Sequence, residues 1–351
     1  MSPFLFRILA AAFPLQWGRK YSRLDKSPAQ WEFALLNGLL RLKHAMEQQR
    51  KGDLHQDYEE SASARRLHQR FAAFSVSPRD PEKTTDNELP AIRLLWVSHP
   101  KDFDVLPHSV LGALRHVKNP VEAIDVVSPS PQEAEKALAD RIPATTTISY
   151  AHDNGVVSAE CREELATELS SHGAWATQQL IKVLMVIRHS PQPTLVIDSD
   201  TVFLRDKVWL DSNGQQLLYF RGYTNPRYQH YLRSWGMSAT DDVRSFVTHH
   251  MLFQPEILGT ALLETFGSTQ ARTLVEAIIS SARQLGFPEF SLDYELYGNV
   301  LWSQRPQNYF LDKYSNIGLA RPRDFASLEA ILAKLRRQGR YNSASFHLPN
   351  R

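Results

Sequence analysis

Two aspartates separated by a single residue follow an apolar run and carry the clearest chemical signal in the sequence. The apolar residues 195–197 lead directly into Asp198, Ser199 and Asp200. In an extended chain Asp198 and Asp200 point to the same side, so both can face one divalent cation. Buried carboxylates each cost several kcal/mol unless a cation or hydrogen-bond donors compensate. The pair predicts a site for Mn²⁺ or Mg²⁺ with a phosphate-bearing ligand, and a capped turn of acidic residues is the alternative.

The helix expected over residues 175–188 would place polar side chains beside these carboxylates. Trp175, Gln178, Gln179 and Lys182 share one helix face at spacings of three and four residues. A lysine next to a metal-binding strand can bind phosphate as a point charge. We therefore expect Gln178, Gln179 and Lys182 to contact a cofactor, with an ordinary solvated face as the alternative.

Strands and helices alternate through the larger part of the chain. Strands are expected at residues 92–97, 123–127, 146–150 and 194–197, and helices at 106–116, 132–139 and 175–188. The continuous apolar character of residues 195–197 is typical of a central parallel strand that is buried on both faces. The pattern predicts an α/β fold with a mostly parallel sheet flanked by helices, and a site at the carboxyl ends of the strands.

The N-terminal quarter is expected to form a separate part. Residues 1–75 would form a helical appendage, residues 76–89 a linker, and residues 90–351 the main domain. The apolar stretch over residues 4–15 is shorter than the ~20 residues that a bilayer span requires. It would lie on a membrane surface as an amphipathic anchor, pack onto the domain as a helix, or serve as a signal peptide.

Composition excludes several classes of protein. The 351 residues carry 40 Lys+Arg against 38 Asp+Glu, a formal net charge of +2 that gives no global reason to expect a nucleic-acid partner. The single cysteine, Cys161, excludes a disulfide framework and a cysteine-based zinc site. Glycine-rich dinucleotide loops, Walker loops and nucleophile elbows are absent from the sequence. We expect a cytoplasmic protein with peripheral contact at the inner face of the membrane.

The motif Val-Ile-Asp-Ser-Asp-Thr-Val-Phe-Leu at residues 196–204 resembles that of the GT-A nucleotide-sugar glycosyltransferases, whose hallmark is Asp-x-Asp at the end of a central strand. A helix that bears Gln and Lys before this strand recurs in such families. From about residue 90 to 350 the chain resembles an uncharacterised bacterial glycosyltransferase-like family. The resemblance implies a GT-A-like fold and metal-dependent sugar transfer from a nucleoside-diphosphate donor to a hydroxyl acceptor, in bacterial glycan or polysaccharide synthesis.

The same resemblance implies two further roles late in the chain. Many GT-A enzymes complete the metal shell, here Asp198 and Asp200, with a late histidine, and His347 occupies such a place. Asp293 or Glu295 would supply the acceptor-site carboxylate, the general base of an inverting enzyme. The alternatives are an exposed histidine and the solvated acidic face of an amphipathic helix.

Four more residues are expected around the donor. His249 and His250 belong to a segment that would border the sugar pocket, and at most one of them faces it because neighbours on a strand point to opposite sides. Ser98 and Asp153 follow the first and third expected strands, whose ends flank the nucleotide base in the GT-A fold.

Two other functions remain open from the sequence. A nucleotidyltransferase would share the sheet and the acidic metal site, but it would carry a glycine-rich basic loop after the first strand, which residues 98–101 match poorly. A non-catalytic sugar-nucleotide or carbohydrate binding module is the other alternative.

Overall fold

The computed structural model describes residues 89–221, 225–237, 245–312, 314–322 and 325–347. The predicted helical appendage at residues 1–75, its membrane contact and all but the end of the predicted linker lie outside these ranges. Within them, no helix combines the length and the apolar character that a membrane crossing requires.

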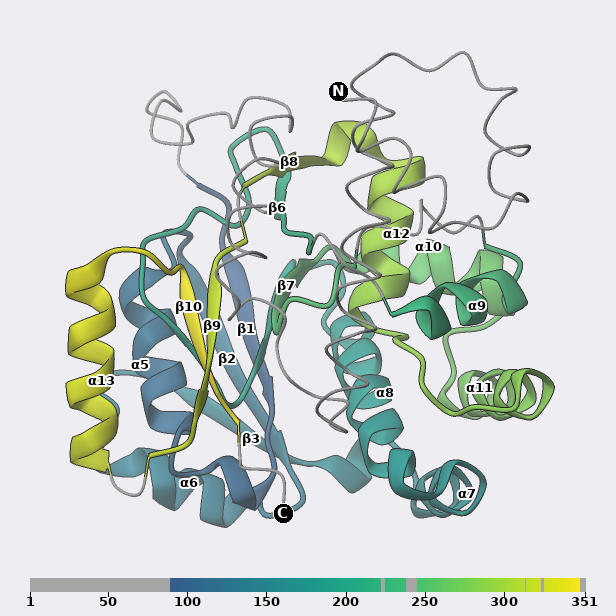
Figure 1. The fold of residues 1–351 in the computed structure, drawn as a ribbon, viewed down its shortest axis with the longest axis horizontal. Coiled ribbons are helices and arrows are strands. Elements are labelled where there is room, and N and C mark those ends of the chain that lie inside the picture. The colour runs from purple at the N-terminus through teal and green to yellow at the C-terminus, as the bar shows by residue number, and fades with distance from the viewer. Residues whose placement is uncertain (1–88, 222–224, 238–244, 313, 323–324, 348–351) are drawn as a thin grey trace, which may run out of the picture. The chain divides into compact units, whose positions relative to one another are not determined.

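A five-stranded sheet with the order β3-β2-β1-β4-β7 forms the centre of the described chain (Figure 1). Its strands are β1 (Ile92–Val97), β2 (Val121–Ser128), β3 (Ile148–His152), β4 (Thr194–Asp198) and β7 (His250–Phe253). The first four run parallel, and β7 pairs with β4 in the antiparallel sense. The prediction of an α/β fold with a mostly parallel sheet is confirmed.

Helices cover both faces of this sheet. The described helices are α5 (Leu106–His116), α6 (Pro131–Ala139), α7 (Ala159–Leu169), α8 (Gly173–Arg188), α9 (Pro226–Ser234), α10 (Pro255–Phe266), α11 (Ala271–Leu285), α12 (Tyr294–Gln304) and α13 (Phe325–Gln338), of which α13 packs on the neighbouring sheet of β5, β10 and β9. Short 3-10 turns are η3 (Pro100–Asp102), η4 (Asp153–Gly155), η5 (Ser170–His172) and η6 (Pro306–Asn308).

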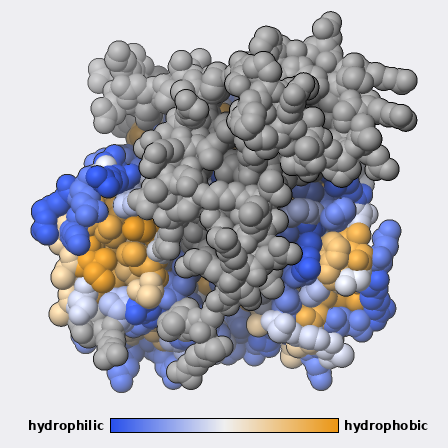
Figure 2. All heavy atoms as spheres, viewed as in Figure 1, coloured by the Kyte–Doolittle hydropathy of each residue, from blue (hydrophilic) through white to orange (hydrophobic). Residues whose placement is uncertain are grey.

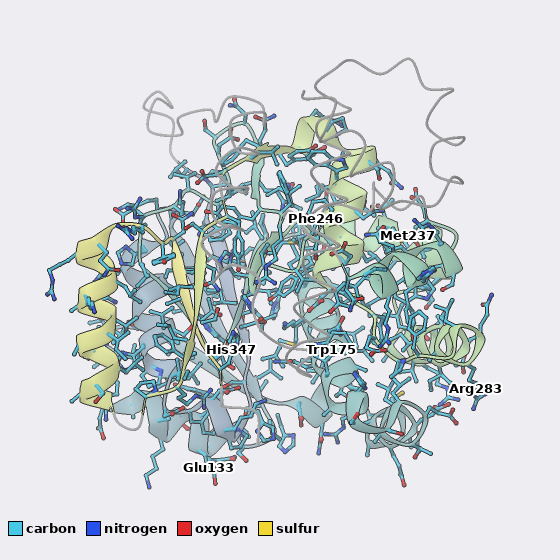
Figure 3. The ribbon with its side chains drawn as sticks, viewed as in Figure 1. Glu133, Trp175, Met237, Phe246, Arg283 and His347 are labelled. Carbon is cyan, nitrogen blue, oxygen red and sulfur yellow. The ribbon has the colours of Figure 1, made fainter. Side chains whose placement is uncertain are left out.

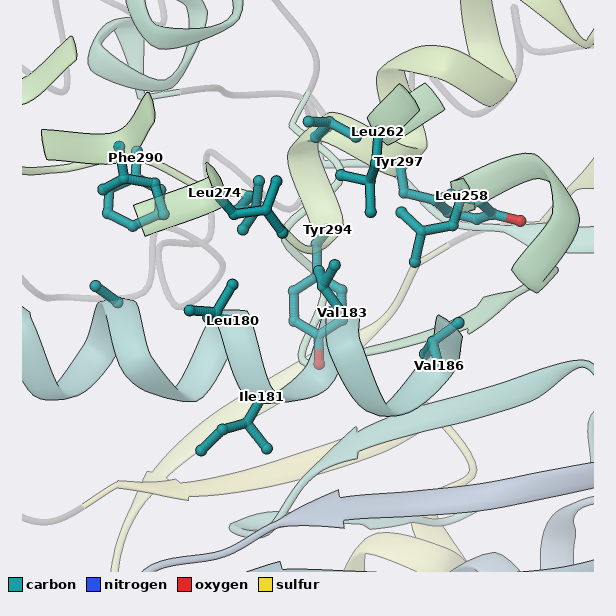
Figure 4. Packing of buried hydrophobic residues seen from close by; sticks show 14 of the residues in the cluster. Leu180, Ile181, Val183, Val186, Leu258, Leu262, Leu274, Phe290, Tyr294 and Tyr297 are labelled. Carbon is teal, nitrogen blue, oxygen red and sulfur yellow. The ribbon is translucent and has the colours of Figure 1, made fainter. Parts of the chain in front are cut away.

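Alternating residues of β1 enter two different hydrophobic clusters. Leu95 and Val97 belong to the cluster built with α7, α8 and α10 to α12, whereas Leu94 and Trp96 belong to the cluster built with α5 and α6. In Figure 4, Ile181 points from α8 toward the sheet, on the side of the helix opposite to Leu180 and Val183. Burial on both faces explains why β1 and β4 are almost continuously apolar.

Two smaller sheets lie beside the central one. β5 (Thr201–Phe203), β10 (Ser343–His347) and β9 (Asn316–Ala320) form one of them, with β10 antiparallel to β5 and parallel to β9. β6 (Gln216–Leu218) and β8 (Tyr309–Leu311) form the other. Because β5 begins three residues after β4 ends, this arrangement brings the end of the described chain next to the Asp-x-Asp segment.

The strand order reverses between β1 and β4. The chain adds β2 and β3 on one side of β1 and then crosses to place β4 on the other side. In open α/β sheets, ligands bind outside the carboxyl ends of the strands at such a reversal. Val97 and Asp198 are direct neighbours there, so the predicted site lies at the position that the topology favours.

Few large apolar side chains of the described residues are exposed. Figure 2 shows hydrophobic residues in separate areas that are bordered by hydrophilic ones. Among the described residues, Leu263 is the large hydrophobic side chain that stands out, with 55% of its surface exposed. Isolated residues of this kind are ordinary in soluble proteins.

The start of α8 tolerates no side chain at Gly173. An added Cβ would lie 2.5 Å from the Cα of Ala166 in α7, and backbone atoms there cannot rotate away. We expect Gly173→Ala to lower the free energy of unfolding by about 1–3 kcal/mol in urea titrations. The matched variant Gly155→Ala, whose added Cβ meets nothing within 4 Å, should change it by no more than about 0.5 kcal/mol. Equal effects of the two variants would contradict this packing account.

Candidate functional site

The Asp-x-Asp segment forms a turn, not an extended strand. Asp198 ends β4, and Ser199 and Asp200 turn before β5 begins at Thr201. The extended conformation expected for this segment is therefore wrong, because β4 belongs to the central sheet and β5 to the neighbouring one and the chain changes direction between them. That both carboxylates face one cation stays a prediction. Asp198 contacts α8 and α12, and Asp200 contacts β10.

Asp198 is surrounded by donors. Its Oδ1 atom accepts from the Lys182 ammonium at 2.6 Å and from the Tyr294 hydroxyl at 2.9 Å. Its Oδ2 atom lies 3.2 Å from Nδ1 of His249. Burial alone would raise the pKa of Asp198, but the charge of Lys182 and the hydrogen bond with His249 hold it well below its ordinary value. Asp198 is therefore an ionised carboxylate at neutral pH.

Lys182 joins two carboxylates from different parts of the chain. Its ammonium lies 2.6 Å from Asp198 and 3.2 Å from Oδ2 of Asp293, and only 5% of the side chain is exposed. Burial would lower the pKa of Lys182, yet the two carboxylates raise it above its ordinary value. The nitrogen also lies 4.6 Å from the ring centroid of Tyr294. The alternative of an ordinary solvated helix face is wrong at Lys182, because its charge is compensated inside the protein.

The two glutamines of this helix face contact backbone. Gln179 is buried, accepts from the Leu292 amide at 2.7 Å and donates to the Phe290 carbonyl at 3.5 Å. Its predicted contact with a cofactor needs correction, because both ends of its amide hold the segment before α12. Gln178 donates to the carbonyl of Val97 at 3.2 Å, at the end of β1.

Asp200 lies beside the late histidine. Its Oδ2 atom is 3.2 Å from Nδ1 of His347, whose position at the end of β10 is labelled in Figure 3. The amide of Phe346 donates to the Asp200 carbonyl at 2.8 Å, which fixes the end of β10 against the turn. The side chains of Asp200 and His347 are 21% and 40% exposed. The side chain of Asp198 is 22% exposed, so exposure does not distinguish the two aspartates.

The two adjacent histidines have different surroundings. His249 reaches Asp198, and its ring centroid lies 5.5 Å from that of His347. His250 is 2% exposed and packs edge-on against the rings of Phe203 and Trp209. Burial, and the neighbouring His249, lower the pKa of His250 to about 3. The predicted binding role of His250 is therefore corrected, because this side chain belongs to the aromatic core.

Asp293 and Glu295 are both buried near the start of α12. Oδ1 of Asp293 accepts from the Tyr294 amide at 2.7 Å and from the Ser291 hydroxyl at 3.1 Å. Glu295 is 0% exposed. Donors to its two oxygens are Gln229 Nε2, Ser245 Oγ and the Phe246 amide, at 3.0, 2.9 and 2.9 Å. This speaks against the predicted contact of Glu295 with an acceptor, because the carboxylate is consumed in holding α9 and the 245–246 segment.

The remaining two predicted residues lie at strand ends, as expected. Ser98 follows β1 and is 2% exposed, and its hydroxyl has no hydrogen-bond partner among the described residues. Asp153 is buried after β3, with its carboxylate 2.9 Å from His152 and 3.3 Å from Arg162 of α7. The Asp153 carboxylate is thus already engaged by these two side chains, which opposes its predicted contact with a nucleotide base.

Two groups that shape the site were not predicted from the sequence. One is Tyr294, whose hydroxyl bonds Asp198 and whose pKa burial and the nearby carboxylates raise well above its ordinary value. The other is a chain of contacts in which Arg321 donates to Asp102 at 2.6 Å and Asp102 accepts from the Ser199 hydroxyl at 3.2 Å. It anchors the turn between the two aspartates. Arg321 and Asp102 are 219 residues apart, so no local pattern points to this contact.

The donor atoms fit a divalent cation only in part. Within the described ranges, no three or more His, Cys, Asp or Glu side chains form a group that could hold a metal ion. Asp198 is engaged by Lys182, so the predicted set of Asp198, Asp200 and His347 is not preformed. The accessible pair of Asp200 and His347 offers a carboxylate oxygen and an imidazole nitrogen. This pair suits a cation that keeps water ligands and binds substrate phosphates.

No family model and no curated protein matches the chain. Among solved structures, mouse xyloside xylosyltransferase 1 in its apo form matches with a TM-score of 0.41 and 13% sequence identity, over 74% of this chain and 100% of that one. A similarity this weak assigns no activity, and the likeness to a bacterial family stays a prediction.

Lys182 should be essential for folding stability. Lys182→Met leaves Asp198 and Asp293 without their shared cation, and we expect a loss of about 3–5 kcal/mol in the free energy of unfolding, measured by urea titration. Lys118→Met, which removes a half-exposed ammonium 2.5 Å from Asp206, is the control and should cost less than about 1 kcal/mol. A Lys182→Met variant as stable as the wild type would show that the buried charges are not coupled.

Proposed function

We propose that the protein is a glycosyltransferase that uses Mn²⁺ or Mg²⁺ to move a sugar from a nucleoside diphosphate to a hydroxyl acceptor. One observation carries the proposal: Asp198 with Lys182, and Asp200 with His347, meet at the carboxyl end of β4, where the strand order reverses. A buried cationic group and an accessible carboxylate–imidazole pair at this edge suit a diphosphate and its cation.

The charge balance supports the need for a cation. Lys182 contributes +1, and Asp198, Asp200 and Asp293 contribute −3 when ionised, so the formal sum is +1 − 3 = −2. A nucleoside diphosphate is itself an anion, and a site with this sum repels it unless a cation is bound. Asp200 and His347 would hold that cation. When bound, it would stabilise the negative charge that develops on the leaving diphosphate.

The buried residues would orient the groups that meet the substrate. Asp293 and Tyr294 hold the Lys182 ammonium from α12, and Asp198 holds it from β4. This arrangement keeps Lys182 charged and fixed beside the donor site. Asp293 stays the acceptor-side carboxylate of the proposal. It is 3% exposed and paired with Lys182, so action as a general base would require it to leave this ion pair and become accessible to the acceptor. We do not propose Glu295 as a base, because its carboxylate is enclosed.

The bacterial glycan or polysaccharide acceptor of the proposal comes from the sequence resemblance. The cytoplasmic setting, with peripheral contact at the inner face of the membrane, comes from the single cysteine and the apolar stretch over residues 4–15.

Asp200→Asn should abolish most of the activity without unfolding the protein. The test incubates the full chain with Mn²⁺ and a panel of nucleoside-diphosphate sugars, and measures release of the nucleoside diphosphate with and without glycan acceptors. We expect the variant to lower kcat/KM on the order of 100-fold, because the cation loses a negatively charged oxygen ligand. The Tm of the variant should equal that of the wild type. Asp206→Asn, whose side chain is half-exposed, is the control.

Two results would contradict the proposed function. Release of inorganic pyrophosphate from a nucleoside triphosphate would indicate a nucleotidyltransferase. Tight binding of nucleotide sugars without any turnover or slow donor hydrolysis would indicate a binding module.

A further inference from the structure

Helices α5 and α13 lie side by side, and their register brings two arginines together (Figure 1). In the first half of each helix, Nδ1 of His108 in α5 lies 3.1 Å from Oε1 of Glu329 in α13. Seven residues make about two helical turns, so side chains seven positions further along lie on the same helix faces. Those side chains are Arg115 in α5 and Arg336 in α13. An imidazole–carboxylate contact at one level is thus followed by two guanidinium groups at the next.

The charges of these two arginines act on each other. Burial, and next the charge of Arg115, hold the pKa of Arg336 below its ordinary value, and the charge of Glu329 opposes this shift. The Nε atom of Arg336 is buried and has no hydrogen-bond partner in the part of the chain that the structure describes. Neighbouring like charges destabilise a folded chain. The pair therefore needs an anion that the described residues do not supply.

A third guanidinium group reaches the same end of α13. Arg205 follows β5, and its Nη2 atom lies 2.7 Å from the point that a Cβ on Gly339 would occupy. The amide of Gly339 in turn donates to the carbonyl of Arg336 at 3.2 Å. The Arg205 side chain therefore ends next to the last turn of α13. Three separate elements, α5, α13 and the segment after β5, each contribute one arginine to this place.

The acidic side chains beside this arginine cluster are engaged by other residues. Asp206 lies 2.8 Å from Nδ1 of His116 and 2.5 Å from the ammonium of Lys118. Glu329 lies against His108. Among the described residues, no carboxylate lies within ion-pair distance of any of the three arginines. Their positive charge is not compensated by direct contact within that part of the protein.

We propose that Arg115, Arg205 and Arg336 form a binding site for a phosphate group. A guanidinium group presents its N–H donors in a planar fork that matches two phosphate oxygens, and arginine stays charged when it is partly buried. A phosphate between the three side chains replaces their repulsion by charge-assisted hydrogen bonds. The group belongs to the head of an anionic phospholipid or to a free phosphate ester, which offer the same chemistry to the site.

The arginine cluster is separate from the candidate functional site. β5 leads away from Asp200 toward Arg205, and β10, which pairs with it in the antiparallel sense, ends at His347. The arginines therefore lie at one end of this small sheet, and Asp200 and His347 lie at the other. The inference does not rest on the proposed function, because neither the cation nor the sugar donor takes part in it.

The first test measures the Tm of the full chain in sodium phosphate and in sodium chloride of equal ionic strength, which separates binding from screening. Phosphate should raise the Tm of the wild type by about 2 °C or more. In Arg115→Gln this rise should be lost, and the Tm in chloride should equal or exceed that of the wild type because one of the like charges is gone. Arg283→Gln, which removes an exposed guanidinium group on α11, is the control and should keep the full rise.

The second test identifies the source of the phosphate. The full chain is sedimented with vesicles of phosphatidylcholine that contain or lack phosphatidylglycerol. If a phospholipid is the ligand, the wild type should bind the anionic vesicles about fivefold more tightly than Arg115→Gln does. If phosphate raises the Tm of the wild type alone and both proteins bind the vesicles equally, the ligand is a free phosphate ester.

Two results would overturn the site. One is a rise of the Tm in phosphate that is as large in Arg115→Gln as in the wild type. The other is no rise in the wild type together with equal vesicle binding by both proteins. Nucleoside diphosphate release should be the same in Arg115→Gln and in the wild type, so a failure of this site and a failure of the proposed function appear in different experiments.

Discussion

The architecture of the site depends on one buried ammonium group. Lys182 of α8 lies between Asp198 at the end of β4 and Asp293 at the start of α12. Removing charges from water is costly, and a buried charge persists only when opposite charges and hydrogen bonds surround it. The three elements are therefore held in one relative position by a contact that apolar packing alone would not specify. Tyr294 and His249 join the same ion pair through their contacts with Asp198.

The two aspartates of the Asp-x-Asp motif have different partners. Lys182, Tyr294 and His249 occupy the oxygens of Asp198, whereas Asp200 lies next to His347. The turn between them, which Asp102 holds through Ser199, makes this difference possible. Their side chains are similarly exposed, at 22% and 21%, so the partners and not the burial distinguish the two aspartates.

The strands and helices were predictable because their signals are local. The expected strand at residues 92–97 and helix at residues 106–116 coincide with β1 and α5. The expected strand at 146–150 was placed two residues early, because pairing with β2 begins only at Ile148. The location of Asp198 at the carboxyl edge also followed from the sequence, since an apolar parallel strand must end there.

The directions of the side chains were not predictable, because they depend on distant residues. Lys182 and Gln179 share a helix face that looks amphipathic, and their burial results from the segment around residues 290–294, more than a hundred positions away. Glu295 resembles a reactive carboxylate in sequence, yet three donors from other elements enclose it. The passage of the chain from β4 in the central sheet to β5 in a neighbouring sheet, which no periodicity indicates, accounts for the turn at Ser199 and Asp200.

The central claim is that a cation binds at Asp200 and connects this edge of the sheet to a nucleoside diphosphate. The most direct measurement is anomalous diffraction from crystals grown with Mn²⁺ and a mixture of nucleoside diphosphates. The account predicts a manganese peak in contact with the Asp200 carboxylate and the His347 ring, with diphosphate density on its other side. A manganese peak elsewhere, or nucleotide bound away from the ends of β1 and β4, would contradict it.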